Sequence, residues 1–342
     1  MAENIASLAS RLESLCKRIL EANGYHIVSA KGARLEHQAD IIALEARNKQ
    51  QIVIEVKLYR SPKVDRSVLR NAAAQVIRLK NSYGAKGMIV VTVPLDQADL
   101  KLLRHIGVDE VWDISEIRKH ANVDIALSTE LERLFRDAEL QYANLPTVPL
   151  AESADQSSLQ LDEQNGEKLI QQLQRTTAGT ADARKFEGLC CECIQYLFGE
   201  HFGQLQPQKR VEHGFQCMDL IARLTPSETG SFWLSLANDF RCRYVVFEFK
   251  NYGPKISQNQ IYTTEKYLYP NALRPVAIIV ARSGYDSGAE RAVQGALRES
   301  GKVILVLSLE HLFRLLRAKD RGLEPSDLLI DHLDNLLTTI AP

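Results

Sequence analysis

The 342-residue sequence has almost no net charge, no long apolar run and few cysteines, and each shortage excludes a class of protein. The 42 Lys and Arg residues and 43 Asp and Glu residues leave a net charge of −1. This excludes a polycation that binds nucleic acid through bulk charge, but not a local basic cleft. Without a run of about 18 apolar residues, we expect no membrane-spanning helix and no membrane partner. The first ten residues lack a basic start followed by an apolar stretch, so we expect a cytoplasmic protein without a secretory signal.

Two chemical motifs are also missing. No phosphate-binding loop of the form GxxxxGK[ST] occurs, so we do not expect this chain to drive translocation with ATP. The six cysteines include one CxxC, formed by Cys190 and Cys193, but no second pair at zinc-finger spacing. The sequence around them is apolar and helical in pattern, so we expect these thiols to fill core volume.

The chain divides in the middle. Its length predicts about two domains. Residues 145–183 are polar, begin with two prolines and carry few apolar positions, which is typical of a linker. A short helix is expected at 159–174, inside a solvated tether. We therefore expect domains at residues 1–143 and 184–342, with a linker at 144–183.

The same order of elements is expected on both sides of the linker: a helix, three strands, a helix, a strand, a helix and a strand. In the first half the ranges are 8–23, 25–30, 39–46, 51–58, 64–81, 87–93, 95–105 and 108–114. In the second half they are 183–201, 207–212, 217–224, 243–250, 257–269, 276–281, 286–300 and 302–307. This order predicts an α/β fold, with a mixed central sheet flanked by helices in each half. Apolar residues within 328–340 predict a C-terminal helix that caps the second sheet.

Acidic residues and lysines recur between the halves at a slowly growing offset. The pairs are Glu13 with Glu187 at 174, Asp40 with Asp219 at 179, Glu55 with Glu248 at 193, and Lys57 with Lys250 at 193. The jump of 14 falls within residues 225–241, where we expect a longer hairpin between two strands. A tandem duplication explains these offsets.

The strand at 51–58 ends in a Glu-x-Lys sequence. Side chains alternate along a strand, so Glu55 and Lys57 share one face. Such charges are costly on a buried strand unless they pair or hold a metal. Asp40, on the neighbouring strand, supplies a second carboxylate, and two carboxylates with water are ligands that Mg²⁺ accepts. The second half repeats this arrangement.

Phosphodiester hydrolysis is the chemistry that such a cluster predicts. A divalent ion lowers the pKa of bound water and screens charge on a phosphoryl oxygen. A lysine orients or deprotonates the attacking water and stabilises the pentacoordinate phosphorus. A single Glu-x-Lys is better explained as a surface ion pair, but two occurrences in matching contexts favour a site.

Both halves resemble the PD-(D/E)xK superfamily of restriction-endonuclease-like nucleases, and the first half is most similar to the Mrr-type catalytic domain. The resemblance is carried by Ala39-Asp-Ile-Ile, Ile52-Val-Ile-Glu-Val-Lys-Leu-Tyr-Arg-Ser and Ala85-Lys-Gly-Met-Ile-Val-Val-Thr. It extends over residues 8–120 and 184–315. It implies an αβββαβ core in each half, dependence on Mg²⁺ or Mn²⁺, and cleavage of nucleic acid, which is DNA for most relatives.

The resemblance also implies roles for particular residues. The metal-binding acids would be Asp40 with Glu55 and Asp219 with Glu248, the catalytic lysines Lys57 and Lys250, and the first-helix acids Glu13 and Glu187. Several relatives carry a glutamine on the helix after the lysine, and the candidates are Gln75 and Gln260, which lie 18 and 10 residues after their lysines. Neither Asp follows a proline, which departs from the motif.

Basic residues near the motifs are candidates for phosphate contacts. Lys63, Arg66 and Arg70 fall on one face of the expected helix at 64–81, with Arg60 just before it and Lys255 in the second half. A helix face that is simply exposed to solvent explains these basic residues equally well. Near-zero net charge predicts weak non-specific binding, so a homodimer or a partner subunit would help to recognise the substrate.

Three functions stay open from the sequence. The first is a metal-dependent endonuclease with two cutting domains, in restriction or anti-phage defence. The second makes one domain catalytic and the other a nucleic-acid or partner-binding module of a defence complex. The third is a non-enzymatic structural subunit.

Overall fold

A computed structural model describes residues 5–28, 39–47, 49–61, 64–138, 140, 165–211, 216–225 and 231–340. They fall into two compact units, one comprising Met1–Glu163 with Asp320–Glu324 and the other Gln164–Lys319 with Pro325–Pro342. Among the described helices, none is both long and apolar enough to cross a membrane.

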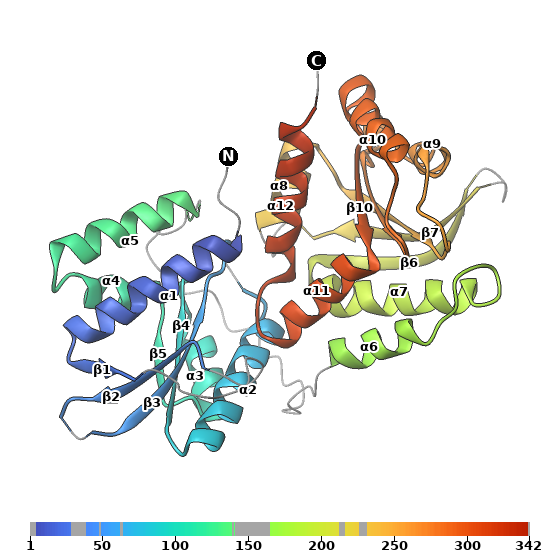
Figure 1. Cartoon of the computed structure of the whole chain (residues 1–342). Coiled ribbons are helices and arrows are strands. Elements are labelled where there is room, and N and C mark those ends of the chain that lie inside the picture. The colour runs from blue at the N-terminus through green and yellow to red at the C-terminus, as the bar shows by residue number, and fades with distance from the viewer. Residues whose placement is uncertain are drawn as a thin grey trace. The chain divides into compact units, whose positions relative to one another are not determined.

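The first unit is a five-stranded mixed sheet with helices packed on it (Figure 1). Its elements are α1 (Ile5–Ala22), β1 (Tyr25–Ile27), β2 (Ile41–Glu45), β3 (Gln51–Lys57), α2 (Arg66–Tyr83), β4 (Lys86–Val91), α3 (Gln97–Ile106), β5 (Glu110–Trp112), α4 (Ile114–Ala121) and α5 (Ile125–Asp137). The strand order is β1-β2-β3-β4-β5, antiparallel up to β3 and parallel from there. Both α1 and α2 contact β3, the central strand.

The second unit repeats this sheet, with the order β10-β9-β8-β7-β6. Its elements are α6 (Asn165–Gln174), α7 (Ala183–Phe198), β6 (Phe202–Val211), β7 (Gln216–Leu224), α8 (Ser231–Asp239), β8 (Tyr244–Lys250), α9 (Gln258–Glu265), β9 (Val276–Ala281), α10 (Ser287–Ser300), β10 (Val303–Ser308), α11 (Leu309–Asp320) and α12 (Pro325–Thr338), with short 3₁₀ turns at Gly199–His201 and Pro270–Ala272. The expected α/β class and the αβββαβ order are therefore confirmed in both halves.

Local sequence explains where these elements begin and end. Asp65 caps α2 by accepting a hydrogen bond from the Ser67 backbone N–H, and Gly84 ends that helix in the left-handed conformation, with φ at 59°. Gly24, with φ at 86°, follows α1. The apolar faces of α1 and α2 are buried against the sheet in one continuous core.

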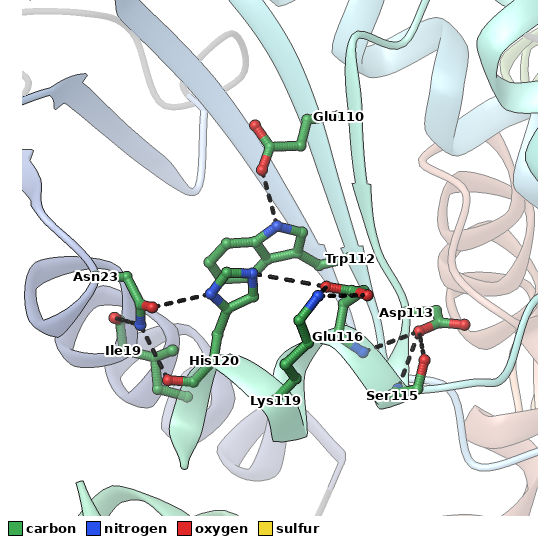
Figure 2. Close-up of polar contacts among 9 residues, drawn as sticks. All are labelled: Ile19, Asn23, Glu110, Trp112, Asp113, Ser115, Glu116, Lys119 and His120. Carbon is green, nitrogen blue, oxygen red and sulfur yellow. Dashed lines mark hydrogen bonds and ion pairs between the residues drawn. The ribbon is translucent and has the colours of Figure 1, made fainter. Parts of the chain in front are cut away.

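One end of α1 is fixed by the contacts in Figure 2. The Asn23 side chain donates to the carbonyl of His120 at 3.0 Å, and its Oδ1 lies 2.9 Å from His120 Nδ1. The His120 ring stacks on Trp112 with centroids 4.0 Å apart, and Trp112 Nε1 donates to Glu110 at 2.9 Å. These contacts join α1 to β5 and α4, and so hold the helix that carries Glu13.

Two sequence expectations need correction. The helix expected within 159–174 exists as α6, but it is not part of a solvated tether: Leu169, Ile170 and Leu173 are buried with the core of the second unit. The expected hairpin at 225–241 contains α8, whose Trp233 is fully buried. The predicted C-terminal helix exists as α12, which packs against α7 and α8 and adds Leu329, Leu333 and Leu336 to the same core.

Candidate active sites

The first site lies where β3 ends. Glu55 and Lys57 share a face, and Lys57 Nζ donates to Glu55 Oε2 at 2.7 Å. Both side chains are buried, 6% exposed for Lys57 and 1% for Glu55. Asp40, just before β2, accepts a 2.8 Å hydrogen bond from the backbone N–H of Val56. The fold thus brings together the three residues that the sequence pattern singled out.

The second site has the same construction at the end of β8. Lys250 Nζ donates to Glu248 Oε2 at 2.6 Å, with side-chain exposures of 16% and 3%. Asp219 of β7 accepts a 2.7 Å hydrogen bond from the backbone N–H of Phe249. Two matching acid–acid–lysine clusters therefore exist, one in each unit.

Burial and repulsion between neighbouring carboxylates raise the pKa of the glutamate at both sites. Burial, with the nearby Asp40 carboxylate, raises the pKa of Glu55 to about 7, while Lys57 pulls it down. Burial, with Asp219, likewise raises the pKa of Glu248 to about 7 against the attraction of Lys250. In each cluster the second acid therefore exchanges its proton near neutral pH, and a cation that binds there has to displace this proton.

In the second cluster, the pKa values of Lys250 and Asp219 are raised as well. Burial opposes the charge on Lys250, yet Glu248 and Asp219 together raise the Lys250 pKa. Burial raises the pKa of Asp219 as well, with a further contribution from Glu187. Lys250 therefore remains a cation at neutral pH, suited to stabilising negative charge on a substrate.

The first-helix acids lie beside the clusters. Glu13 of α1 is half buried, and its burial and the Asp40 carboxylate raise its pKa. Glu187 of α7 is close enough to Asp219 to contribute to the raised pKa of that acid. The structure thus brings both predicted glutamates to their sites.

The two candidate glutamines behave differently. Gln75 of α2 accepts a 3.4 Å hydrogen bond from Lys57 Nζ, as a site residue would. Gln260 instead accepts hydrogen bonds from the backbone N–H and the hydroxyl of Ser257, at 2.9 and 3.0 Å, and closes the N-terminal cap of α9. The side chain of Gln260 is thus used at the start of its own helix, and among the described residues no hydrogen bond joins it to Lys250.

The carboxylate pairs fit a divalent cation. Glu55 Oε1 and Glu248 Oε1 are buried and have no hydrogen-bond partner among the described residues. A buried acceptor without a donor is costly, and a cation would satisfy it. Within the described ranges no group of three or more His, Cys, Asp or Glu side chains is gathered around one point. Each site thus offers two carboxylates, which is the set that Mg²⁺ uses together with water and substrate phosphates.

The basic candidates of the first unit are less available than the sequence indicated. Arg60 is 5% exposed, and its Nε donates to the carbonyl of Ala138 at 3.4 Å, so little of its side chain is accessible to a phosphate in this conformation. Arg66 pairs with Asp99 at 3.1 Å.

The remaining basic candidates differ in exposure. Arg70 is partly buried, and Lys63 lies outside the described residues. Lys255, in the loop after β8, is exposed. Of these residues, Lys255 therefore best keeps its predicted availability to a phosphate group.

Sequence reasoning missed two residues beside Lys250. Asn251 donates to the carbonyls of Thr177 and Gly179, both at 2.9 Å, and accepts from Arg282 Nε at 2.6 Å. Arg282 also donates to the hydroxyl of Thr176. These bonds fasten the turn before α7 to the end of β8. The only signal in the sequence was the position of Asn251, directly after the lysine.

A buried carboxylate–lysine pair beside a strand-start aspartate is the arrangement expected of the PD-(D/E)xK class of nucleases. Comparison with known families supports this class: residues 7–98 match the family model Mrr_cat, described as restriction endonuclease. Residues 7–98 thus match a restriction-endonuclease catalytic domain of this type, and the matched range contains Glu13, Asp40, Glu55, Lys57 and Gln75.

Solved structures give a weaker likeness. One neighbour is the restriction endonuclease FokI bound to DNA, with 10% identity and a TM-score of 0.32 over 78% of this chain and 52% of that one. Another structure of restriction endonuclease FokI has 12% identity and a TM-score of 0.33, over 83% and 49%. The chain spans about half the length of these neighbours, and TM-scores this low carry no conclusion about activity. No curated protein matches the chain.

Proposed function

We propose that this chain is a divalent-metal-dependent endonuclease that hydrolyses phosphodiester bonds of DNA, with one cutting centre in each half, at residues 1–143 and 184–342. The observation that carries the proposal is the duplicated cluster. Glu55 and Lys57 form a buried ion pair next to Asp40, and the second unit repeats this geometry. A buried ion pair stabilises a fold little, so two copies at equivalent positions favour a chemical role.

Each side chain has a distinct task in this mechanism. Asp40 and Glu55 would hold Mg²⁺ or Mn²⁺, which lowers the pKa of a water molecule and offsets charge on the phosphoryl oxygen. Lys57, held by Glu55 and Gln75, orients the attacking water and stabilises the negative charge on the phosphate. In the second unit, Asp219 and Glu248 would hold the metal ion and Lys250 would take the role of Lys57, at a second phosphodiester bond.

The biological setting that we propose is restriction or anti-phage defence. The net charge of −1 predicts weak binding to nucleic acid without a concentrated basic surface. A second copy of the chain or a partner subunit would then deliver the substrate. The matching geometry of both clusters favours two cutting domains over one cutting and one binding domain.

Plasmid cleavage by the full chain tests the proposal. With Mg²⁺ we expect the wild type to nick and linearise a supercoiled plasmid, and chelation with EDTA to stop both. Lys57→Met and Lys250→Met should each keep nicking and lose linearisation, and the double variant should lose both. The control Lys119→Met removes a lysine that is 70% exposed and should cut normally.

Other outcomes select other functions. If one single variant loses all cleavage while the other retains wild-type cutting, only one unit is catalytic. A wild type that is inert on DNA and RNA, with Mg²⁺ or Mn²⁺ and with its natural partners, would contradict the nuclease proposal. Thermal denaturation of each variant shows whether a loss of cutting reflects a loss of folding.

A further inference from the structure

The second unit carries a cluster of arginines away from its acid–acid–lysine centre. Arg223 of β7 lines two adjoining cavities that are open to the surface, of about 290 and 580 Å³. Arg274 lines the first cavity, and Arg241 and Arg243 line the second. None of the described residues that line these cavities is acidic.

These arginines form no ion pairs among the residues that the structure describes, although the Arg274 guanidinium lies 5.4 Å from the centroid of the Tyr269 ring. Arg274 Nε is also buried and, within the described ranges, has no hydrogen-bond partner. A guanidinium without a carboxylate partner keeps its N–H donors available for bidentate contact with phosphate oxygens.

The sheet connects this cluster to the second centre. Side chains alternate along β7, so Asp219, Ile221 and Arg223 share one face. Arg223 pairs in register with Gln204 of β6 and Tyr244 of β8. Both neighbours, with Ile221, line the first cavity. A hollow surface therefore begins on the same face as the second centre.

The distance between the second centre and Arg223 fits an extended ligand. Arg223 lies four steps along the strand from Asp219, which is about 13 Å at about 3.3 Å per step. A phosphate group at Arg223 is therefore a different one from the phosphate that is cut. Polar Gln204 and aromatic Tyr244 accompany the arginines, and amide and aromatic side chains among cations suit a nucleic-acid strand.

Gly203 makes room for this arrangement. The β6 strand has an irregular register between Phe202 and Gln204. A Cβ at Gly203 would lie 3.0 Å from an Arg223 terminal nitrogen. The Arg223 guanidinium thus lies over bare backbone at this irregularity. In the first unit, the position four residues after Asp40 is Leu44, where Arg223 stands four residues after Asp219.

We propose that the cavities around Arg223 bind the phosphodiester backbone of the nucleic-acid strand that reaches the second centre, at phosphates distant from the bond that is cut. This rests on the proposed function, and it assigns substrate contacts to the second unit. The alternative occupant, a free nucleotide or inorganic phosphate, has the same phosphate chemistry.

Binding of a fluorescein-labelled oligonucleotide to the full chain, followed by anisotropy in EDTA, tests the proposal without cleavage. We expect Arg223→Gln with Arg274→Gln to weaken binding by about tenfold or more, because each arginine supplies a charged hydrogen bond to a phosphate. The slope of log affinity against log salt should fall by about one for each phosphate that is no longer neutralised. Arg291→Gln, an exposed arginine on α10, is the matched control and should bind as the wild type does.

The outcomes separate this proposal from the function on which it rests. If the wild type binds and cuts DNA but the double variant shows unchanged affinity and salt slope, the arginine surface is not a substrate contact and the nuclease stands. If the wild type neither binds nor cuts nucleic acid, both proposals fail. If inorganic phosphate or a nucleoside triphosphate binds in an Arg223-dependent way while oligonucleotides do not, the site serves a small ligand and the strand proposal is overturned.

Discussion

The backbone N–H of Val56 donates a 2.8 Å hydrogen bond to the Asp40 carboxylate, which ties the start of β2 to the end of β3. Phe249 and Asp219 repeat the bond at 2.7 Å. In both units the aspartate thus has one oxygen anchored to the strand that carries the glutamate and lysine. A carboxylate has acceptor capacity beyond one such bond, so the anchored group still has lone pairs for a cation.

The first prediction is that Mg²⁺ stabilises the protein more at about pH 8 than at about pH 5.5. Without metal, the raised pKa values of Glu55 and Glu248, about 7 against an ordinary 4.5, favour the protonated folded state. That contribution to stability is complete below about pH 4.5 and is lost as the pH rises through 7. Because the ion binds the deprotonated acids, its stabilising effect should grow over the same range. Denaturation midpoints with and without Mg²⁺ measure it.

The matched control is the Glu55→Gln, Glu248→Gln double variant, which should lose both the metal effect and its pH dependence. Buried histidines titrate in the opposite sense: burial lowers the pKa of His332 to about 4, so its contribution is lost as the pH falls. The informative quantity is therefore the difference between wild type and variant. A metal effect that is equal at both pH values, or that persists in the double variant, contradicts the prediction.

The second prediction concerns Gln75, which accepts a 3.4 Å hydrogen bond from Lys57. In a Lys250→Met background, only the first unit is expected to cut. There, Gln75→Ala should slow plasmid nicking by about fivefold, which corresponds to a rise of about 1 kcal/mol in the activation free energy. Its denaturation midpoint should change little. Gln75→Glu, which keeps the acceptor, should recover most of the rate. A normal rate for Gln75→Ala would leave the residue without a positioning role.

The third prediction concerns Gln260, which the sequence placed at the second centre and the fold uses elsewhere. In a Lys57→Met background, Gln260→Ala should nick at the unchanged rate of the second unit. Its loss should appear in stability, at about 0.5–2 kcal/mol, because the variant opens the cap that Ser257 forms at α9. Urea denaturation measures the stability. A lower nicking rate with unchanged stability would show instead that Gln260 acts at the second centre.

The alternation of side chains along a strand made the two clusters predictable. Once 51–58 is a strand, Glu55 and Lys57 must share a face, and the repeat supplies the same argument for the second unit. The fate of Gln260 was predictable too, because Ser257 and Gln260 have the Ser-x-x-Gln spacing of a capping box.

Other features depend on distant partners and could not be predicted from local sequence. The helix α8 is short, and Trp233 is buried by ring contacts with Phe198 and Phe202, which belong to other elements. The helix α6 is stabilised in the same way by packing against α7. The burial of Arg60 is likewise invisible in a sequence, where a charged residue indicates a surface position.

The fourth prediction is that Asn23→Ala destabilises the first unit. Asn23 donates to the Ile19 and His120 carbonyls and lies 2.9 Å from His120 Nδ1 (Figure 2). Removing it leaves part-buried groups without partners, at a cost of about 1–3 kcal/mol. Asn81→Ala, at an exposed position of α2, is the control and should not destabilise. Equal denaturation midpoints for the two variants would show that the contacts at His120 do not hold α1.

The fifth prediction separates two basic candidates for substrate contact. Arg66 is engaged with Asp99 at 3.1 Å and Asp96 at 3.9 Å, whereas Lys255 is exposed in the loop after the second lysine motif. Lys255→Gln should therefore lower the slope of log affinity against log salt by about one, because one phosphate is no longer neutralised. Arg66→Gln should leave that slope unchanged and lower stability by at most about 1 kcal/mol, as expected for a partly exposed ion pair. Anisotropy titrations of a labelled oligonucleotide over a salt series measure both. A reduced slope for Arg66→Gln with an unchanged one for Lys255→Gln would reverse the assignment, and would mean that Arg66 leaves its aspartates when nucleic acid binds.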